Sequence, residues 1–340
     1  GVLDGQNLVG VIGDSACDAT ASGSAADRLV NTEQVTAIVG ALCTGATIGG
    51  ANTAAIPGNV VMISPASTAG ALTTLDDNDL VFRTTPSDSF QGIQLARLLL
   101  SKGITDVALT YVNNDYGSGL TNDFTSTYEA EGGTISVSLA HEEGRADYRA
   151  DLGSLAAGGS EHLLVIAYAS GSGQTIVRQA VESGDFLSFI GVDGMVGDDI
   201  FVGTDASALE GMFATRAGAF EGESATVYAE LATAASIAPD AVYAPQAYDA
   251  AFLLALAIEK NGSADREGLS AALREVASGP GEIIMPGEWE KAKALIAAGE
   301  DINYEGAGGS LDFDEVGDVD GIIVELAVEG GSFVEKGLID

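Results

Sequence analysis

Short apolar runs rich in β-branched residues alternate along this chain with stretches that have the period of a helix. The runs are Leu8–Ile12, Val35–Val39, Val60–Ile63, Val107–Val112, Ile135–Leu139, Leu163–Ala167 and Phe186–Val192. Most are followed at once by Gly, Ser, Asn or Asp, which is typical of buried parallel strands. The helical stretches between them are Ser24–Thr32, Phe90–Lys102, Leu120–Glu131, Tyr148–Ala157 and Gln174–Ser183. This order of strand and helix predicts doubly wound α/β lobes with parallel sheets.

The last third of the chain has a different pattern. Beyond Phe213 four helical stretches follow one another without a long strand, at Ala225–Ala235, Ala244–Lys260, Glu267–Val276 and Glu288–Ala298. We expect these helices to cover a lobe that is already formed, and the late apolar run Ile322–Val328 to return to an earlier sheet. A chain of 340 residues, 46% of them hydrophobic, is too long for one ordinary domain, so two lobes are expected.

The charge of the chain excludes some classes of partner. Fifty acidic residues against fourteen basic ones give a formal net charge of -36, which repels nucleic acid and anionic membrane surfaces. Such a charge is typical of a protein adapted to salty surroundings. No stretch approaches the roughly 20 apolar residues of a membrane-spanning helix, and the first residues lack the basic start of a signal peptide. We therefore expect a soluble chain without its export signal.

Motifs for catalysis or metal binding are weak. The segment Gly13-Asp14-Ser15 resembles the nucleophile block of some serine esterases, but the only histidines, His141 and His162, carry no matching motif. We expect both to be surface histidines. Two histidines and two cysteines do not make a typical zinc set, and in the calcium-like run 312–318 Val316 replaces an oxygen ligand. The glycine-rich segments 117–119 and 171–173 are too short to bind a nucleotide. We expect no enzyme activity, no metal and no cofactor.

Two turns rich in small hydroxyl residues follow neighbouring strands. One comprises residues 41–47 and contains Leu42 and Thr44, and the other comprises residues 64–69 and contains Ser67 and Thr68. In open α/β sheets the ligand crevice lies at the carboxyl ends of the strands, where backbone N–H groups and threonine hydroxyls can hold a carboxylate. Simple helix capping by Thr44 and Thr68 explains the same residues equally well.

The two cysteines, Cys17 and Cys43, each lie close to the end of a strand-like run. They are either a free pair in a reducing compartment or a disulfide that closes a loop of about 25 residues in an oxidising one.

At these turns the sequence resembles the branched-chain amino-acid-binding proteins, within the type I periplasmic solute-binding proteins of ABC importers, and the likeness extends to the end of the chain. The matching segments are Gly13–Asp18 with Gly40–Thr44, Ile63–Thr68, Phe82–Pro86 with Gln91–Gly92, Asn114–Gly117 and Ile190–Gly194. The resemblance implies a disulfide between Cys17 and Cys43. It also implies that a first strand and helix of the family fall before Gly1.

The same resemblance implies a set of ligand-binding residues. Thr44 and Thr68 would bind the carboxylate of an amino acid, and the Ser67 carbonyl and the Asp193 side chain would bind its ammonium group. Tyr116 would close on the ligand from the second lobe. The set is completed by Leu42 and Ala169. Ala169 is next to Tyr168, near the position where the family has another aromatic residue. Asp193 is shorter than the glutamate of the best-known leucine binders.

The implied fold has two lobes joined by a three-segment hinge. The first lobe would comprise residues 1–85 and 217–311, and the second residues 86–216 and 312–340. The implied function is capture of a branched-chain or similar aliphatic amino acid, in the periplasm or elsewhere outside the cytoplasm, by a monomer that delivers it to an ABC permease. The alternatives are another small carboxylate, an amide or a urea-type solute, a ligand-sensing domain of a receptor and, least favoured, an α/β enzyme.

Overall fold

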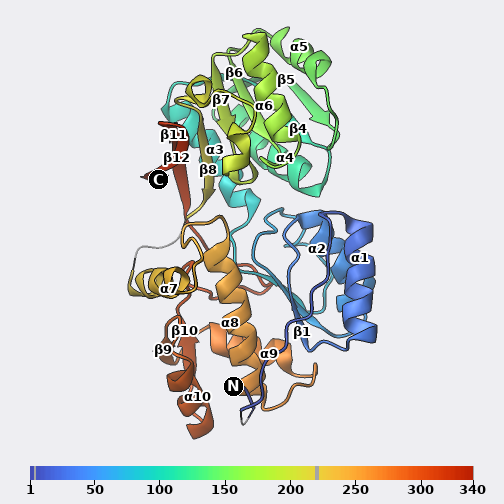
Figure 1. Cartoon of the computed structure of the whole chain (residues 1–340), viewed down its shortest axis with the longest axis vertical. Coiled ribbons are helices and arrows are strands. Elements are labelled where there is room, and N and C mark those ends of the chain that lie inside the picture. Colours follow the sequence, from blue (N-terminus) through green and yellow to red (C-terminus); the bar gives the residue numbers. More distant parts are fainter. Residues whose placement is uncertain (4, 219–221, 340) are drawn as a thin grey trace. The chain divides into compact units, whose positions relative to one another are not determined.

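The computed structural model describes residues 1–3, 5–218 and 222–339 and divides the chain into two compact units (Figure 1). Unit 1 comprises Gly1–Ser87 and Ala219–Gly321, and unit 2 comprises Asp88–Gly218 and Ile322–Asp340. The chain therefore passes from one unit to the other three times. Two of the passages lie close to the expected positions 85/86 and 216/217. The third lies at 321/322 instead of 311/312.

This third boundary corrects the expected one, and the reason is packing. Leu311, Phe313 and Val319 are buried in the core of unit 1. The Phe313 ring lies edge-on to Phe82, with ring centroids 4.9 Å apart. Residues 312–321 therefore belong to unit 1, and the chain enters unit 2 only after Gly321.

Unit 1 is built on a parallel sheet of three strands, in the order β1 (Ala37–Val39), β2 (Val61–Ser64) and β3 (Val81–Arg83). Alternate β2 residues enter different clusters of buried side chains. Val61 and Ile63 join the cluster that contains α8 and α9, while Met62 joins the cluster that contains α1 and the turn after α2. Both faces of this sheet are thus covered, as the doubly wound prediction requires.

The helices of unit 1 come from both of its chain segments. They are α1 (Ala19–Asp27), α2 (Thr44–Gly50), α7 (Glu223–Ala234), α8 (Ala244–Asn261), α9 (Leu269–Ala277) and α10 (Trp289–Ala298). A single π-helical turn follows α1 at Arg28–Thr32 and another follows α2 at Ala51–Ala55. Two short strands, β9 (Glu282–Ile284) and β10 (Ile302–Tyr304), pair in parallel with each other.

The prediction of a strand at Leu8–Ile12 is wrong. These residues form no strand, and Val9 and Ile12 are 83% and 89% exposed. Within the described chain β1 pairs only with β2, so no strand lies beside this run to take up its backbone hydrogen bonds. The segment is held instead by the Arg28 guanidinium, which donates to the Ile12 carbonyl at 2.5 Å.

Unit 2 contains one sheet of seven strands, in the order β12-β11-β8-β7-β6-β4-β5. The strands are β4 (Asp106–Val112), β5 (Thr134–His141), β6 (His162–Ile166), β7 (Ser188–Gly191), β8 (Phe213–Ala217), β11 (Ile323–Glu329) and β12 (Ser332–Leu338). Strands β4 to β8 are parallel, and β11 pairs antiparallel with β8 and β12. The late run thus returns to an existing sheet, as predicted.

Four helices flank this sheet, α3 (Asp88–Ser101), α4 (Asp115–Ala130), α5 (Arg149–Ala156) and α6 (Ser172–Ser183) (Figure 1). Helix α3 packs on α4, and α5 packs on α6. Their buried side chains and those of the strands form a single continuous core. The predicted α/β class with doubly wound parallel sheets is confirmed.

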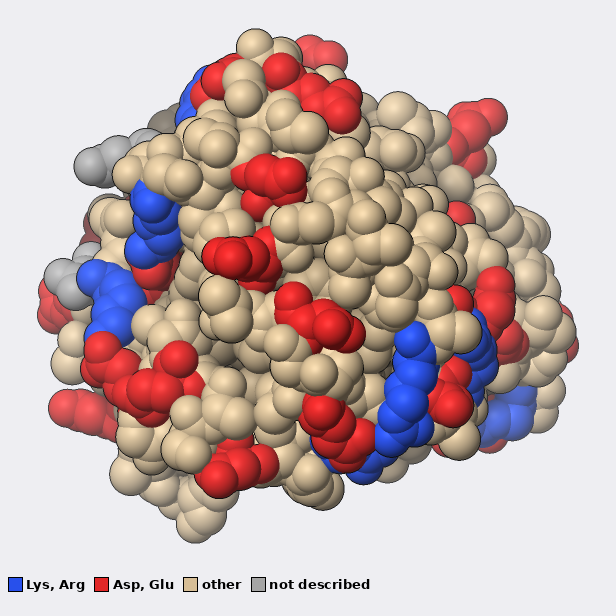
Figure 2. All heavy atoms as spheres, turned by 90° about the horizontal axis from the view of Figure 1, so that it is seen from above, with Lys and Arg blue, Asp and Glu red and all other residues tan. Residues whose placement is uncertain are grey.

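In the described residues no helix is long and apolar enough to span a membrane. Acidic side chains are scattered over the face drawn in Figure 2, and the fewer basic side chains lie beside acidic ones.

Candidate functional site

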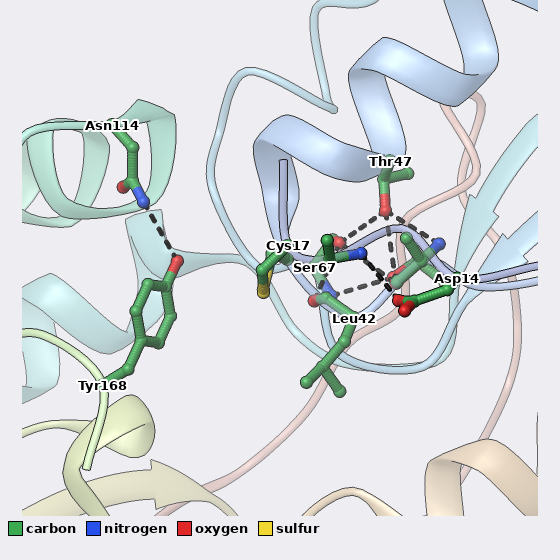
Figure 3. Close-up of a disulfide and its surroundings, with 11 residues drawn as sticks. Asp14, Cys17, Leu42, Thr47, Ser67, Asn114 and Tyr168 are labelled. Carbon is green, nitrogen blue, oxygen red and sulfur yellow. Dashed lines mark hydrogen bonds between the residues drawn. A yellow bond between two sulfur atoms is a disulfide. The ribbon is translucent and has the colours of Figure 1, made fainter. Parts of the chain in front are cut away.

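Unit 1 brings the two hydroxyl-rich turns together through a network of side-chain hydrogen bonds (Figure 3). The Ser67 hydroxyl lies 2.7 Å from the Thr47 hydroxyl and donates to the Leu42 carbonyl at 3.1 Å. Ser64 donates to the Ala41 carbonyl at 2.6 Å and accepts from the Ser67 N–H at 2.9 Å. The turn after β1 and the turn after β2 therefore hold each other in place.

Both predicted threonines are buried in this arrangement, each 2% exposed. The Thr44 hydroxyl, at the start of α2, accepts from the Ala69 N–H at 3.4 Å. The Thr68 hydroxyl is buried without a hydrogen-bond partner among the described residues. A buried hydroxyl without a partner costs free energy, so this oxygen is suited to meet a polar group of a ligand. The Thr68 hydroxyl therefore does not cap a helix among the described residues.

A disulfide joins Cys17 and Cys43, whose Cα atoms are 5.3 Å apart (Figure 3). Cys43 immediately precedes α2, and Asp18, next to Cys17, caps α1 by accepting from the Ala21 N–H at 2.8 Å. The crosslink thus fixes the starts of two packed helices. Leu42, beside it, is 59% exposed and points away from the hydroxyl network.

In unit 2 the predicted acid Asp193 follows β7 and is only 4% exposed. The Tyr116 hydroxyl donates to its Oδ1 at 2.7 Å, and Gln91 Nε2 lies 3.3 Å from the same oxygen. Gln91 is itself held by the carbonyl and the hydroxyl of Thr215, both at 3.1 Å. The carboxylate is therefore oriented by side chains from α3 and α4 and by β8.

Tyr116 and Tyr168 form an aromatic pair beside this acid, with ring centroids 5.3 Å apart and nearly parallel planes. The Tyr168 hydroxyl accepts from Asn114 at 3.2 Å (Figure 3). Burial raises the pKa of Tyr168, and the charges of Asp193, Glu143 and Asp88 raise it further. The ring is a neutral phenol at physiological pH.

The residues around Asp193, after β7, pack closely on those around Tyr168, after β6. The Ala169 N–H donates to the Gly194 carbonyl at 2.8 Å. A Cβ atom at Gly194 would lie 2.5 Å from the Ala167 carbonyl and 2.9 Å from the Tyr116 hydroxyl, so only glycine fits there. Ala169 is buried and small beside the larger Tyr168.

Five further residues support the candidate ligand-binding groups of the two units, which we call the two candidate half-sites. They are Thr47 and Ser64 in unit 1 and Gln91, Asn114 and Tyr168 in unit 2, and none was assigned to the ligand set. The resemblance implied Ala169 instead of its larger neighbour Tyr168. The other four lie in the turns and family-like segments already named, so their place in those segments was the available signal.

The expectation that both histidines lie at the surface is wrong for His141, which is 2% exposed. Its Nδ1 lies 2.8 Å from the Thr110 hydroxyl and its Nε2 3.0 Å from the Ser172 hydroxyl. Burial lowers the pKa of His141 to about 4. A buried imidazole between two hydroxyls is a structural group of unit 2.

Comparison with known proteins agrees with this arrangement. Residues 1–326 match the family model described as receptor family ligand binding region. The chain is 30% identical over 277 residues to the leucine-, isoleucine-, valine-, threonine- and alanine-binding protein of Pseudomonas aeruginosa, covering 81% of this chain and 73% of the relative. It is 27% identical over 337 residues to BasB, a chemotactic signal transduction system substrate-binding protein of Halobacterium salinarum, covering 92% and 74%.

Among solved structures, the leucine-binding protein LivK of Thermotoga maritima has a TM-score of 0.82 and 25% identity, covering all of this chain and 89% of that one. Two α/β units with parallel sheets, between which the chain passes three times, define a type I periplasmic binding protein. The chain belongs to the branched-chain amino-acid-binding protein family, the solute-binding proteins of ABC importers, which are not enzymes.

Proposed function

We propose that this protein binds a branched-chain or similar aliphatic amino acid as a zwitterion. The two half-sites would hold its two charged groups, the unit 1 turns the carboxylate and the unit 2 acid the ammonium. Because burial of a zwitterion requires a matched donor cluster and acceptor cluster, the two units would have to contribute together. The ligand would then favour a closed form of the protein.

The carboxylate half-site is supported by its supply of donors. Thr44 and Thr68 are buried, and the Thr68 hydroxyl has no hydrogen-bond partner among the described residues. The Ser67 hydroxyl already donates within the turns, so it is the threonines that remain to bind a ligand. A carboxylate that accepts charge-assisted hydrogen bonds from such groups is bound more strongly than a neutral group.

The ammonium half-site carries the proposal. Asp193 is buried, and the Tyr116 hydroxyl and the Gln91 amide orient its carboxylate from one side. A buried carboxylate requires a compensating positive charge or several donors. A ligand ammonium group would add a positive charge and further donors to these two side chains, and the aromatic ring of Tyr116 would add a surface that attracts a cation.

An aliphatic side chain is supported by the relatives. The Pseudomonas relative is named for leucine, isoleucine, valine, threonine and alanine, and the Thermotoga structure for leucine. The exposed Leu42 offers an apolar surface beside the carboxylate turns.

The test is calorimetry with leucine, isoleucine and valine on the wild type and on Asp193→Ala. Truncation of one partner of a buried charge pair costs about 2–5 kcal/mol, so we expect the dissociation constant to rise by roughly 30-fold or more. Asp106→Asn is a control in the same unit, since Asp106 begins β4 at the amino ends of the parallel strands, whereas Asp193 follows the carboxyl end of β7. An unchanged dissociation constant in Asp193→Ala would contradict the assignment.

We also propose that the protein works outside the cytoplasm and delivers its ligand to an ABC permease. The family supports this partner, and the Cys17–Cys43 disulfide supports an oxidising compartment. Co-purification of the liganded protein with the permease in detergent, and its loss without ligand, tests the delivery step.

A second candidate function is ligand sensing. The Halobacterium relative is a substrate-binding protein of a chemotactic system, and its match extends over 92% of this chain. In that case the same ligand-bound form would bind a membrane transducer. Binding to a transducer's extracytoplasmic domain, with no binding to a permease, would favour this role.

A further inference from the structure

Arg83, the last residue of β3, is a buried guanidinium only 1% exposed. Its Nη1 donates to the Thr68 carbonyl at 2.6 Å and to the Ala69 carbonyl at 3.1 Å. Its Nε donates to Asp318 at 2.7 Å, and its Nη2 donates to the Thr73 hydroxyl at 2.7 Å and to the other oxygen of Asp318. The planar fork of the guanidinium thus has a partner in each of its directions.

The charge of this guanidinium is compensated, so its role at the turn is geometric. Asp318 pairs with it through both carboxylate oxygens and also accepts from Thr73 at 2.7 Å. A buried ion pair of this kind contributes little net stability compared with apolar residues of the same volume. Its effect is to fix where the neighbouring backbone lies.

The peptide between Thr68 and Ala69 connects Arg83 to the ligand half-site. Its carbonyl accepts from Arg83, and its N–H donates to the Thr44 hydroxyl at 3.4 Å. Because a peptide unit is planar, fixing the carbonyl also fixes the N–H on its other side. Since the Thr44 hydroxyl accepts from this N–H, its own proton is directed elsewhere.

The same network reaches the segment that leads out of unit 1. The Arg83 N–H donates to the Gly317 carbonyl at 3.1 Å, and Asp318 is the next residue. A Cβ atom at Gly317 would lie 2.7 Å from the Val81 carbonyl, so the segment runs directly against β3. Arg83 therefore ties the turn at Thr68 to the chain before the first and the third passage between the units.

We propose that Arg83 is a positioning residue of the carboxylate half-site, which aims the Thr44 and Thr68 hydroxyls at the ligand through the peptide between Thr68 and Ala69. Asp318 and Thr73 hold the guanidinium in the orientation that this requires. The inference rests on the proposed function, because it assigns these hydroxyls to a ligand carboxylate.

The experiment compares Arg83→Met with Arg266→Met. The half-buried Arg266 is a matched control in unit 1, because its guanidinium also donates to backbone carbonyls, those of Val35, Gly58 and Val30 at 3.0, 3.1 and 2.7 Å. None of those carbonyls belongs to the candidate turns. Calorimetry would measure binding of leucine, of 3-methylbutylamine, which lacks the carboxylate, and of 4-methylpentanoate, which lacks the ammonium.

We expect Arg83→Met to weaken leucine binding by roughly 10-fold or more, the effect of misplacing hydrogen bonds to a charged group. The ratio of leucine to 3-methylbutylamine affinity should fall equally, because the loss is confined to the carboxylate. The ratio of leucine to 4-methylpentanoate affinity should stay the same. Arg266→Met should lower the melting temperature and leave every ratio within about twofold of wild type.

If Arg83→Met does not fold, Thr73→Val provides the same test, because it removes one support of the guanidinium and keeps its charge pair. A smaller fall in the leucine to 3-methylbutylamine ratio is then expected. Ratios unchanged in these variants, or changed equally in Arg266→Met, would overturn the inference. Failure of the proposed function would give a different result. The wild type would then bind 3-methylbutylamine as tightly as leucine, because it would not require the carboxylate.

Discussion

The two proposed half-sites use opposite chemistry. Unit 1 uses neutral groups, hydroxyls and peptide N–H groups on two short turns, and fixes them with a disulfide and a buried guanidinium. Unit 2 uses a buried carboxylate held by a tyrosine and a glutamine beside a stacked aromatic pair. The main sheets of the described chain differ as well, with three short strands in unit 1, beside the separate pair of β9 and β10, and seven strands in unit 2.

This difference teaches that the two proposed half-sites are held in place by different means. In unit 2 a large sheet with one continuous core already places Asp193 and Tyr116 on neighbouring elements. In unit 1 the smaller sheet leaves its turns to be held by side-chain hydrogen bonds and the disulfide, with bonds from Ser64, Ser67 and Arg83. Loss of single crosslinks or side-chain hydrogen bonds should therefore affect unit 1 more than unit 2.

Removal of the disulfide should give the largest difference in stability between the units. With Cys17→Ser and Cys43→Ser, we expect the free energy of unfolding of unit 1 to fall by about 2–4 kcal/mol, while unit 2 is unaffected. The only tryptophan, Trp289, lies in α10 of unit 1, so its fluorescence during denaturation reports that unit. An unchanged tryptophan transition would contradict the role given to the crosslink.

Acid should act on the two units with opposite sign. Burial lowers the pKa of His141 to about 4 in unit 2, so below about pH 6.5 only the unfolded chain binds this proton and stability falls. Burial raises the pKa of Asp249 to about 6 in unit 1, so between pH 6 and 4 the folded chain binds the extra proton and stability rises.

Each of these slopes approaches about 1.4 kcal/mol per pH unit at its steepest. Around His141 lie Thr110, Ser172 and the Tyr148 ring, with the charges of Asp151, Arg145 and Glu142 as smaller influences. Amide hydrogen exchange of peptides from each unit between pH 7 and 5, corrected for intrinsic rates, measures both slopes. His141→Gln and Asp249→Asn should each flatten the slope of their own unit, and slopes of the same sign in the wild type would refute the comparison.

Thr68→Val should separate ligand affinity from stability. The Thr68 hydroxyl has no hydrogen-bond partner among the described residues, so its replacement by a methyl group should leave the melting temperature unchanged or slightly higher. Affinity for leucine should fall by roughly 10-fold, the value of one hydrogen bond to a charged group. Thr121→Val, which also removes a buried hydroxyl without a partner, is the control in unit 2 and should not alter affinity.

The smallest expected effect distinguishes the two stacked tyrosines. Tyr116→Phe removes the hydroxyl that orients Asp193, and we expect affinity to fall by about three- to tenfold. Tyr168→Phe keeps the stacked ring and loses only the bond from Asn114, so affinity should stay within about twofold. Equal losses in both variants would mean that the aromatic pair acts as one unit and that the hydroxyl of Tyr116 is not special.

The sequence predicted the regular parts of the fold well, because buried strands such as β2 and β6 have apolar β-branched runs bounded by turn residues. It failed at Leu8–Ile12, since hydrophobicity indicates a strand but does not supply a partner. The boundary at Gly321 also escaped prediction, because it depends on Phe313 and Asp318 packing against residues more than 200 positions earlier.

Candidate site residues could be named from the sequence where they lie in a motif, but side chains that act through another residue could not. Thr44, Thr68, Tyr116 and Asp193 came from a resemblance of turns, and the structure leaves their contact with a ligand as a proposal. The segments that contain Gln91 and Arg83 also resembled the family, but the contacts of these side chains with Asp193 and Asp318, more than 100 positions away, are seen only in the structure.

The central claim is that one ligand must satisfy both half-sites. Calorimetry of the wild-type protein with leucine, 3-methylbutylamine and 4-methylpentanoate tests it most directly. We predict that leucine binds and that each analogue binds roughly 100-fold more weakly, because each leaves the polar groups of one half-site without a charged ligand group. Binding of either analogue as tightly as leucine would contradict the zwitterion site.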